Sequence, residues 1–146
     1  MRSRTKARAW ALQVLYAWEI RGRDAPTSEL EADLGRLRYA QRAPDVRDYA
    51  RRILRIVEDR LHEIDARIEA LASNWRLSRM TTVDRNILRI AAAEMVFLNE
   101  IPPRVSIQEA IRLAEWFGTE ESARFINGIL DALLHELEPE RLTDRR

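Results

Sequence analysis

A helical spacing of apolar residues runs along almost the entire chain, and it limits the possible folds more than any other feature. The spacing is clearest between Asp45 and about Ala72, where apolar residues recur at steps of three and four: Val46, Tyr49, Ile53, Val57, Leu61, Ile64, Ile68 and Leu71. At about 1.5 Å per residue, a helix of this length spans roughly 40 Å. No segment alternates in the way a strand does, so the sequence predicts an all-α fold.

The same spacing predicts five further helices, and residues typical of helix ends set their limits. They run from Thr5 to Ile20, from Pro26 onward, from Thr81 to Leu98, from Ser106 to Phe117 and from Thr119 to about Leu137. Three starts carry a capping-box pattern: Ser28 with Glu31, Thr81 with Asp84, and Ser106 with Glu109.

We therefore expect a compact helical bundle of about six to seven helices in two sub-bundles that divide near residues 73–78. Residues 1–137 are expected to form a single domain, followed by a loose tail over residues 138–146.

Composition excludes several classes of protein. The chain has 146 residues and is nearly neutral, with 25 Lys and Arg against 24 Asp and Glu. It has no cysteine, which excludes a disulfide framework and a thiolate metal site. No stretch approaches the roughly 18 uncharged apolar residues of a membrane span, and no long apolar run follows the basic N-terminus as in a signal peptide. We expect a cytoplasmic protein without a membrane contact.

Enzyme chemistry has little support in the sequence. His62 and His135 stand far apart in predicted helices, without the spacing of a metal-binding motif. The glycines are isolated, so they form no phosphate-binding loop, and no two carboxylates are marked as a catalytic pair. We expect no catalytic residue, no cofactor and no metal.

The N-terminus carries the one clear cluster of a single charge. Its cations are Arg2, Arg4, Lys6 and Arg8, and no acid appears before Glu19. On a helix, Arg2, Lys6 and Tyr16 share the face opposite the apolar stripe, which Arg4 and Arg8 flank. Cations beside an exposed ring suit single-stranded nucleic acid, because they meet phosphates while the ring stacks on a base. The alternative is that the basic stretch only aids solubility.

Two later helices hold further candidates. Glu94 falls among apolar residues, and a buried carboxylate needs a partner, so we expect an arginine or a helix N-terminus beside it. On the same helix, Asp84, Arg85 and Arg89 are expected to be accessible, either for a protein partner or for solvent. Phe125 lies off the apolar stripe of the last helix, where it either packs on a neighbouring helix or stacks on a base.

Several segments together resemble the NusB family of transcription antitermination factors. They are KAR (6–8) leading to ALQVLYAW (11–18), VDRNILRI (83–90), IPP (101–103) with IQEA (107–110), and FGTEESARFINGILD (117–131). The resemblance covers nearly the whole chain in the same order. The family differs at three positions: it often has an aromatic residue in place of Ala93, asparagine in place of Gln108 and aspartate in place of Glu121.

The resemblance implies an all-helical protein of two small bundles. It implies binding to the boxA element of ribosomal RNA leader transcripts, jointly with the ribosomal protein NusE, within an RNA polymerase antitermination complex. With Arg2 from the basic cluster, the implied RNA contacts are Arg4, Lys6, Arg8, Tyr16, Glu121, Ser122, Phe125 and Asn127. The implied NusE-facing residue is Asp84, with Arg85 as its accessible neighbour.

Other functions stay open at this point. A helical protein-interaction module with an incidental basic N-terminus would show the same composition. A NusB-like domain also precedes some RNA cytosine methyltransferases, but such an enzyme needs a Rossmann-like domain with a Gly-rich loop, for which this chain leaves no room. The sequence also leaves open whether the free protein forms a homodimer that covers its RNA face.

Overall fold

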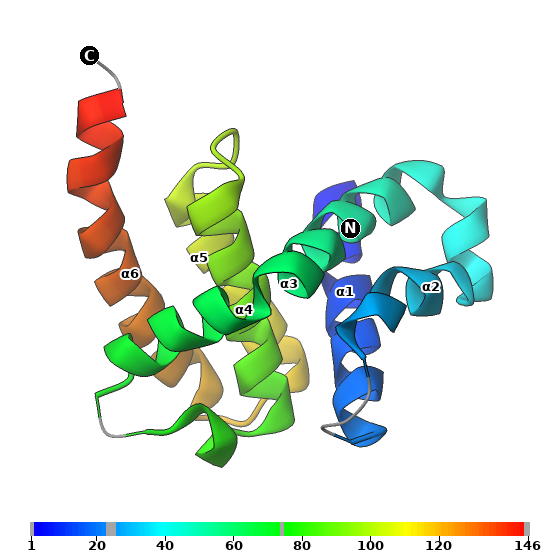
Figure 1. Ribbon diagram of the computed structural model, residues 1–146, viewed down its shortest axis with the longest axis horizontal. Coiled ribbons are helices and arrows are strands. Elements are labelled where there is room, and N and C mark those ends of the chain that lie inside the picture. Colours follow the sequence, from blue (N-terminus) through cyan, green and yellow to red (C-terminus); the bar gives the residue numbers. More distant parts are fainter. Residues whose placement is uncertain (1, 23–25, 74, 145–146) are drawn as a thin grey trace.

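The computed structural model describes residues 2–22, 26–73 and 75–144, with side chains as far as residue 138 (Figure 1). Within these residues the chain forms α-helices and short 3-10 helices, without a strand. The α-helices are α1 (Ser3–Ile20), α2 (Leu30–Gly35), α3 (Pro44–Leu71), α4 (Thr82–Phe97), α5 (Pro103–Phe117) and α6 (Ser122–Asp144). The 3-10 helices are η1 (Thr27–Glu29), η2 (Arg38–Arg42) and η3 (Leu77–Arg79). The all-α prediction is confirmed.

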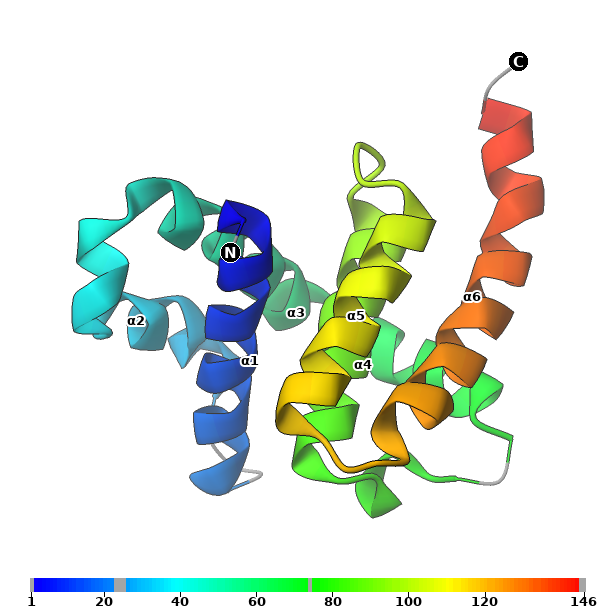
Figure 2. The same ribbon diagram turned by 180° about the vertical axis from the view of Figure 1, so that it is seen from behind.

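The helices form two groups that share one core. Helices α1 and α2 pack with α3 on one side of the molecule, and α4, α5 and α6 pack together on the other (Figures 1 and 2). The long helix α3 crosses from the first group to the second, and its regular geometry breaks at Arg60, where φ is −125° and ψ is 21°. Buried residues from both groups, such as Leu15 and Leu130, belong to a single hydrophobic cluster. The two sub-bundles are therefore joined by α3 and by this shared core.

The helix starts confirm the N-terminal cap of one of the three predicted capping boxes. Thr81 precedes α4, and its hydroxyl accepts a hydrogen bond from the N–H of Asp84 at 3.1 Å. The other two predictions are wrong. Helix α2 follows the short turn η1 without a side-chain cap, and the N–H of Glu31 donates instead to the carboxylate of Glu58.

Helix α5 begins at Pro103, so Ser106 is buried inside its first turn instead of preceding it. Proline suits that first position because its nitrogen carries no hydrogen that would lack a partner.

The last helix is longer than expected. It continues to Asp144 instead of ending near Leu137, and its final turns project away from the other helices (Figure 1). The division into a domain of residues 1–137 and a loose tail of residues 138–146 stays a prediction, and residues 145–146 lie outside the described residues.

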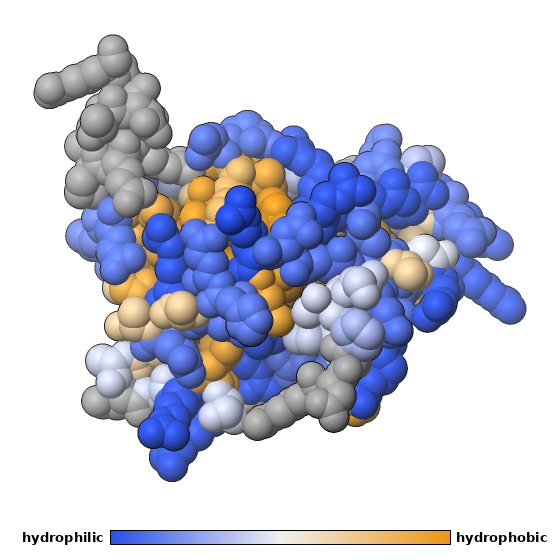
Figure 3. Space-filling model, in the orientation of Figure 1, coloured by the Kyte–Doolittle hydropathy of each residue, from blue (hydrophilic) through white to orange (hydrophobic). Residues whose placement is uncertain are grey.

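The surface is largely polar, as the high content of charged residues suggests. On the face seen in Figure 3, hydrophilic residues cover most of the area, and apolar residues come to the surface mainly over α4 and α5. Among the described residues, no helix combines the length and the apolar character needed to cross a membrane.

Candidate nucleic-acid interface

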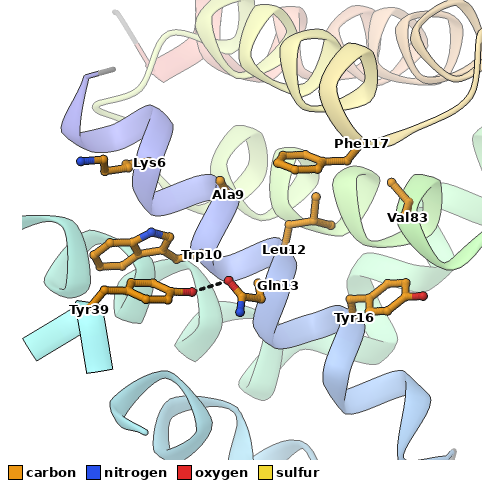
Figure 4. Close-up of a pocket in the computed structure, with 9 residues that line it drawn as sticks. All are labelled: Lys6, Ala9, Trp10, Leu12, Gln13, Tyr16, Tyr39, Val83 and Phe117. Carbon is orange, nitrogen blue, oxygen red and sulfur yellow. Dashed lines mark hydrogen bonds between the residues drawn. The ribbon is translucent and has the colours of Figure 1, made fainter. Parts of the chain in front are cut away.

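One open groove lies along the exposed face of α1 (Figure 4). Its volume is about 760 Å³, and its walls come from four elements that lie far apart in the sequence. Helix α1 supplies Lys6, Ala9, Trp10, Leu12, Gln13 and Tyr16; η2 supplies Tyr39, α4 supplies Val83 and α5 supplies Phe117. The groove thus combines a cation with four aromatic rings. It brings together Lys6 and Tyr16, which the sequence places on one face of the first helix.

The rings of Trp10 and Tyr39 form one wall of this groove. Their centroids are 4.8 Å apart with an angle of 59° between the planes, and the Tyr39 hydroxyl donates to the side-chain oxygen of Gln13. These contacts fix η2 against α1. Tyr39, Tyr16 and Phe117 remain 40%, 44% and 52% exposed, so their faces are open to a ligand.

The predicted N-terminal cations occupy different surroundings. Arg2, Arg4 and Lys6 are exposed. Lys6 lies at the groove, whereas the guanidinium of Arg4 lies 4.9 Å from the centroid of the Tyr49 ring of α3. Since Arg4 and Lys6 are two residues apart on a helix, they point to opposite sides of α1. The structure therefore does not bring all the predicted cations to one surface.

Arg8 is not free to meet RNA, which corrects the prediction for this residue. Its side chain is only 3% exposed, and its Nε lies 2.9 Å from both carboxylate oxygens of Glu94. Glu94 is fully buried and also accepts a hydrogen bond from the Tyr49 hydroxyl. The expectation that Glu94 meets an arginine inside the bundle is thus confirmed. The charge of Arg8 is used to neutralise this carboxylate, because an unpaired one would be costly in the core.

The pKa shifts of Arg8 and Tyr49 in this buried cluster follow from their contacts with Glu94. Burial alone would lower the pKa of Arg8, but the hydrogen bond to Glu94 and the charge of Glu94 outweigh it and raise that pKa. Burial, together with the neighbouring Glu94, raises the pKa of Tyr49 above its ordinary value, so the phenol stays protonated and donates. The cluster extends to α5, where Glu109 accepts from the Thr5 hydroxyl at 2.9 Å. Four helices therefore meet at this cluster.

The start of α4 is less accessible than the sequence suggests. Arg89 is 5% exposed and holds both carboxylate oxygens of Asp65, at 2.8 and 2.9 Å. Arg85 is half-buried, and its Nε donates to Glu19 at 2.9 Å.

Asp84 is 7% exposed, and its Oδ1 has no hydrogen-bond partner among the described atoms. The expectation of accessible side chains is wrong for Asp84 and Arg89. The physical reason is that α4 packs against α1, α3, α5 and α6, which leaves it few exposed positions.

The start of α6 gives a mixed result. Ser122 is 1% exposed and accepts a hydrogen bond from the N–H of Thr119 at 2.9 Å, so it serves the helix start. Phe125 is half-buried and packs edge-on against Trp75, with ring centroids 6.2 Å apart. Glu121 and Asn127 are exposed. Because Phe125 and Asn127 are two residues apart on a helix, they face different sides.

Sequence reasoning missed four aromatic residues of these surfaces, namely Trp10, Tyr39, Trp75 and Phe117. Trp10 lies at the edge of an apolar stripe, and Phe117 lies at a helix end. The sequence therefore predicts where they lie on their helices, but it does not predict how exposed they are. Tyr39 and Trp75 lie in short connecting segments without a periodic pattern. The one sequence signal that could have identified them is an aromatic residue in a connecting segment.

Metal ligation finds no support in the part of the chain that the structure describes. No three side chains of His, Asp or Glu there are grouped to hold an ion. His62 and His135 are both exposed.

Fold and groove together define a class: an all-helical protein with an open groove that combines one cation with four aromatic rings. A family model described as "NusB family" matches residues 5–135, and the chain belongs to this family. The resemblance stated from the sequence segments is confirmed.

Relatives of this chain carry the name "Transcription antitermination protein NusB". The protein from Acidothermus cellulolyticus is 43% identical over 133 residues, covering 91% of this chain and 88% of the relative. The protein from Chloroherpeton thalassium is 37% identical over 142 residues, covering 92% of this chain. The chain spans 63% of the length of that relative. Since these relatives are antitermination proteins, the expectation that the chain is not an enzyme is confirmed.

Solved structures of the family have the same fold. NusB of T. maritima superposes with a TM-score of 0.82 at 37% identity, covering 91% of both chains. A structure entitled "Crystal Structure of Antitermination Factors NusB and NusE in complex with dsRNA" has a TM-score of 0.72 at 29% identity. It covers 90% of this chain and 96% of the matched chain.

Proposed function

We propose that this chain is a cytoplasmic transcription antitermination factor that binds the boxA element of ribosomal RNA leader transcripts together with NusE, within an RNA polymerase antitermination complex. Membership of the NusB family over residues 5–135 supports this role. The similar structure of NusB and NusE with dsRNA supports the choice of NusE and RNA as partners. The mechanism is assembly of a complex and involves no catalytic step.

The observation that carries the RNA part of the proposal is the groove along α1. Lys6 and Tyr16 line it, and both are exposed. Lys6 would meet a phosphate, and the open ring of Tyr16 would stack on a base. Arg2 and Arg4 would add phosphate contacts beside the groove, since both are exposed at the start of the same helix.

The role of Arg8 in this proposal changes from a contact to a positioning residue. It anchors α1 on Glu94 of α4 and thereby sets the orientation of Lys6 and Tyr16 relative to the rest of the fold. Its loss would act on RNA binding through the helix that it holds.

The start of α6 would form a second part of the RNA surface. Phe125 offers an edge-on pair with Trp75, while Glu121 and Asn127 are exposed nearby. Ser122 would act indirectly, because its buried hydroxyl holds the turn that precedes the helix. The carboxylate of Glu121 repels phosphate, so this part would contact bases or the protein partner instead of the RNA backbone.

NusE would meet the start of α4. Asp84 is almost buried and Arg85 is engaged by Glu19, so these two residues would shape the surface there and offer little area themselves. The Oδ1 of Asp84 has no hydrogen-bond partner among the described atoms, but it is buried, so a partner's donor does not reach it in this conformation.

Few cations are available at the groove, so affinity for RNA alone should be modest and strongly dependent on salt. Contacts from NusE to the same RNA would raise that affinity, because the second protein converts part of the binding into an intramolecular step.

The test measures binding of the full chain to a boxA RNA and to a scrambled RNA over a salt series, with and without NusE. We expect a preference for boxA that NusE strengthens. Lys6→Ala should lower RNA affinity and reduce the salt slope by about 0.7, which is the share of one phosphate contact on a single strand. Arg67→Ala is the matched control, because it removes one cation from α3 outside the groove.

Equal binding to both RNAs, unchanged by NusE, would contradict the proposal. Binding of NusE without any RNA preference would instead favour the protein-interaction module.

A further inference from the structure

A second cationic and aromatic surface overlaps the groove: it shares the wall formed by Trp10 and Tyr39 and adds two arginines that have had no role in RNA binding so far. It consists of Trp10 from α1 with Arg38, Tyr39 and Arg42 from η2, and we call it the η2 platform. The ring contact between Trp10 and Tyr39 and the hydrogen bond from Tyr39 to Gln13 hold η2 against α1. Trp10 lies one helical turn from Lys6, so the platform continues the groove (Figure 4).

The two arginines of the platform differ from their neighbours in charge pairing. Both Arg38 and Arg42 are exposed, and the side chain of neither makes an ion pair or a hydrogen bond within the residues that the structure describes. By contrast, each arginine on the first half of α3 lies within reach of a carboxylate: Arg47 at 3.6 Å from Asp48, Arg51 at 3.6 Å and Arg55 at 3.1 Å from Glu31, and Arg52 paired with Glu100.

The positive charge of this region is therefore neutralised on α3 and left open on η2. Unneutralised arginines attract a polyanion, and they would weaken an apolar protein contact by their cost of desolvation.

The aromatic part of the platform is open at the same place. Tyr39 stands between the two arginines in the sequence and is 40% exposed, and Trp10 beside it is half-buried. An exposed ring and unpaired cations on one short segment are the combination that binds single strands: the cations meet successive phosphates, and a base stacks on the ring. A duplex would offer its phosphates but would keep its bases from the ring.

We propose that the η2 platform binds a further stretch of the same RNA as a single strand, on the flank of the element held by Lys6 and Tyr16. The proposal rests on the proposed RNA-binding function and extends it to a new contact surface. The platform would add two phosphate contacts and one stacked base. It would therefore lengthen the bound RNA without changing which core sequence is preferred.

The experiment compares three RNAs: the core element alone, the core with single-stranded flanks on both sides, and the core with the same flanks closed into duplexes. For the wild-type chain we expect tighter binding to the RNA with single-stranded flanks than to either of the other two. Arg38→Gln with Arg42→Gln should weaken binding to that RNA about tenfold and lower its salt slope by about 1.4, the share of two phosphates. The core RNA should bind this variant as it binds the wild type.

Two control variants separate charge from ring chemistry. Arg51→Gln with Arg55→Gln removes two nearby arginines that are already paired, and binding of the flanked RNA should stay within about twofold of wild type. Tyr39→Phe keeps the ring and should bind the flanked RNA nearly as well, whereas Tyr39→Leu should weaken it about tenfold, within the range for one stacked base.

Failure of this inference is distinguishable from failure of the proposed function. If the wild type prefers boxA but the η2 variants bind flanked RNA normally, the platform proposal is overturned while the function stands. Equal tightening by duplex flanks would also overturn it, because the ring would then have no part. Loss of NusE binding with unchanged RNA binding would identify the platform as a protein surface. No preference for boxA by the wild type would reject the proposed function itself.

Discussion

Helix α1 has two faces, and Lys6 and Arg8 show how different they are. The two cations are two residues apart in one helix, and both belong to the same basic cluster. Lys6 is exposed at the groove, whereas Arg8 is 3% exposed and paired with Glu94. The comparison teaches that a cluster of one charge is not one functional unit. The neighbouring helix decides which cation is available to a ligand and which one supports the fold.

The largest effect should follow from breaking the buried side of this comparison. Arg8→Ala leaves Glu94 charged and unpaired in the core, which should lower the free energy of unfolding by about 3–5 kcal/mol. Denaturant unfolding measures it. The combined variant Arg8→Met, Glu94→Met and Tyr49→Phe should recover most of the loss, because the buried pair of Arg8 and Glu94 is then removed as a whole. A stable Arg8→Ala protein with weak RNA binding would instead assign Arg8 to the RNA.

Substitutions on the exposed groove face of α1 should change RNA binding and hardly change the free energy of unfolding. Tyr16→Leu removes an exposed ring from the groove and should weaken binding to boxA RNA by about 1–3 kcal/mol. Tyr16→Phe retains the ring and serves as its control. Titration of labelled RNA measures the affinity, and unfolding curves check that both variants remain folded. Equal losses in the two variants would show that the hydroxyl matters and the ring does not.

A substitution in the turn after α5 tests how rigidly Phe117 is held at the groove. A Cβ at Gly118 would lie 2.5 Å from the Ser122 hydroxyl and 2.8 Å from the carbonyl oxygen of Ala114. Gly118→Ala should therefore cost about 1–2 kcal/mol of stability and should also weaken RNA binding, because Phe117 precedes it directly.

Gly128→Ala is the matched control for that variant. A Cβ there meets nothing within 4 Å, so in helix α6 the change should raise stability by about 0.5–1 kcal/mol. Thermal unfolding of the two variants compares them, and equal midpoints would contradict the crowding at Gly118.

The smallest effect is a dependence on pH at the end of α1. Burial alone would raise the pKa of Glu19, but the hydrogen bond from Arg85 and the charge of Arg89 outweigh it and lower that pKa. A carboxyl group whose pKa is lowered in the folded state stabilises the protein at pH values above the ordinary glutamate pKa of about 4.3. This contribution is lost as the pH falls through the lowered value.

Unfolding free energies measured between about pH 6 and pH 3 test this linkage. Glu19→Gln should remove part of the acid sensitivity of the wild type. A variant that keeps the full slope would show that other carboxyl groups cause it.

Much of the fold was predictable because packing follows the apolar spacing. The limits of α3, α4 and the end of α5 lie within one residue of the sequence prediction, since long amphipathic stripes leave little choice. Two of the three capping boxes failed, because Ser28 and Ser106 match the local pattern but the chain enters the helices elsewhere. A capping-box pattern alone does not show that a helix has already begun at an earlier proline or 3-10 turn.

The candidate site was predictable in part. The need of Glu94 for a cationic partner follows from its place on an apolar stripe, and the structure supplies that partner. The identity of the partner did not follow, because Arg8 lies 86 positions away in the sequence. The roles of Tyr39 and Trp75 were not predicted for the same reason. Their contacts with Trp10 and Phe125 depend on segments that meet only after folding.

By itself, the sequence determined the helical class, the family and the presence of cations and an aromatic ring on one face of the first helix. Those properties depend on periodicity and on local residue order, which a chain carries before it folds. Only the tertiary structure decided that Arg8 is a core residue, that Asp84 and Arg89 are covered, and that η2 completes the groove. Burial and ion pairing arise between distant segments, so their outcome is fixed by packing.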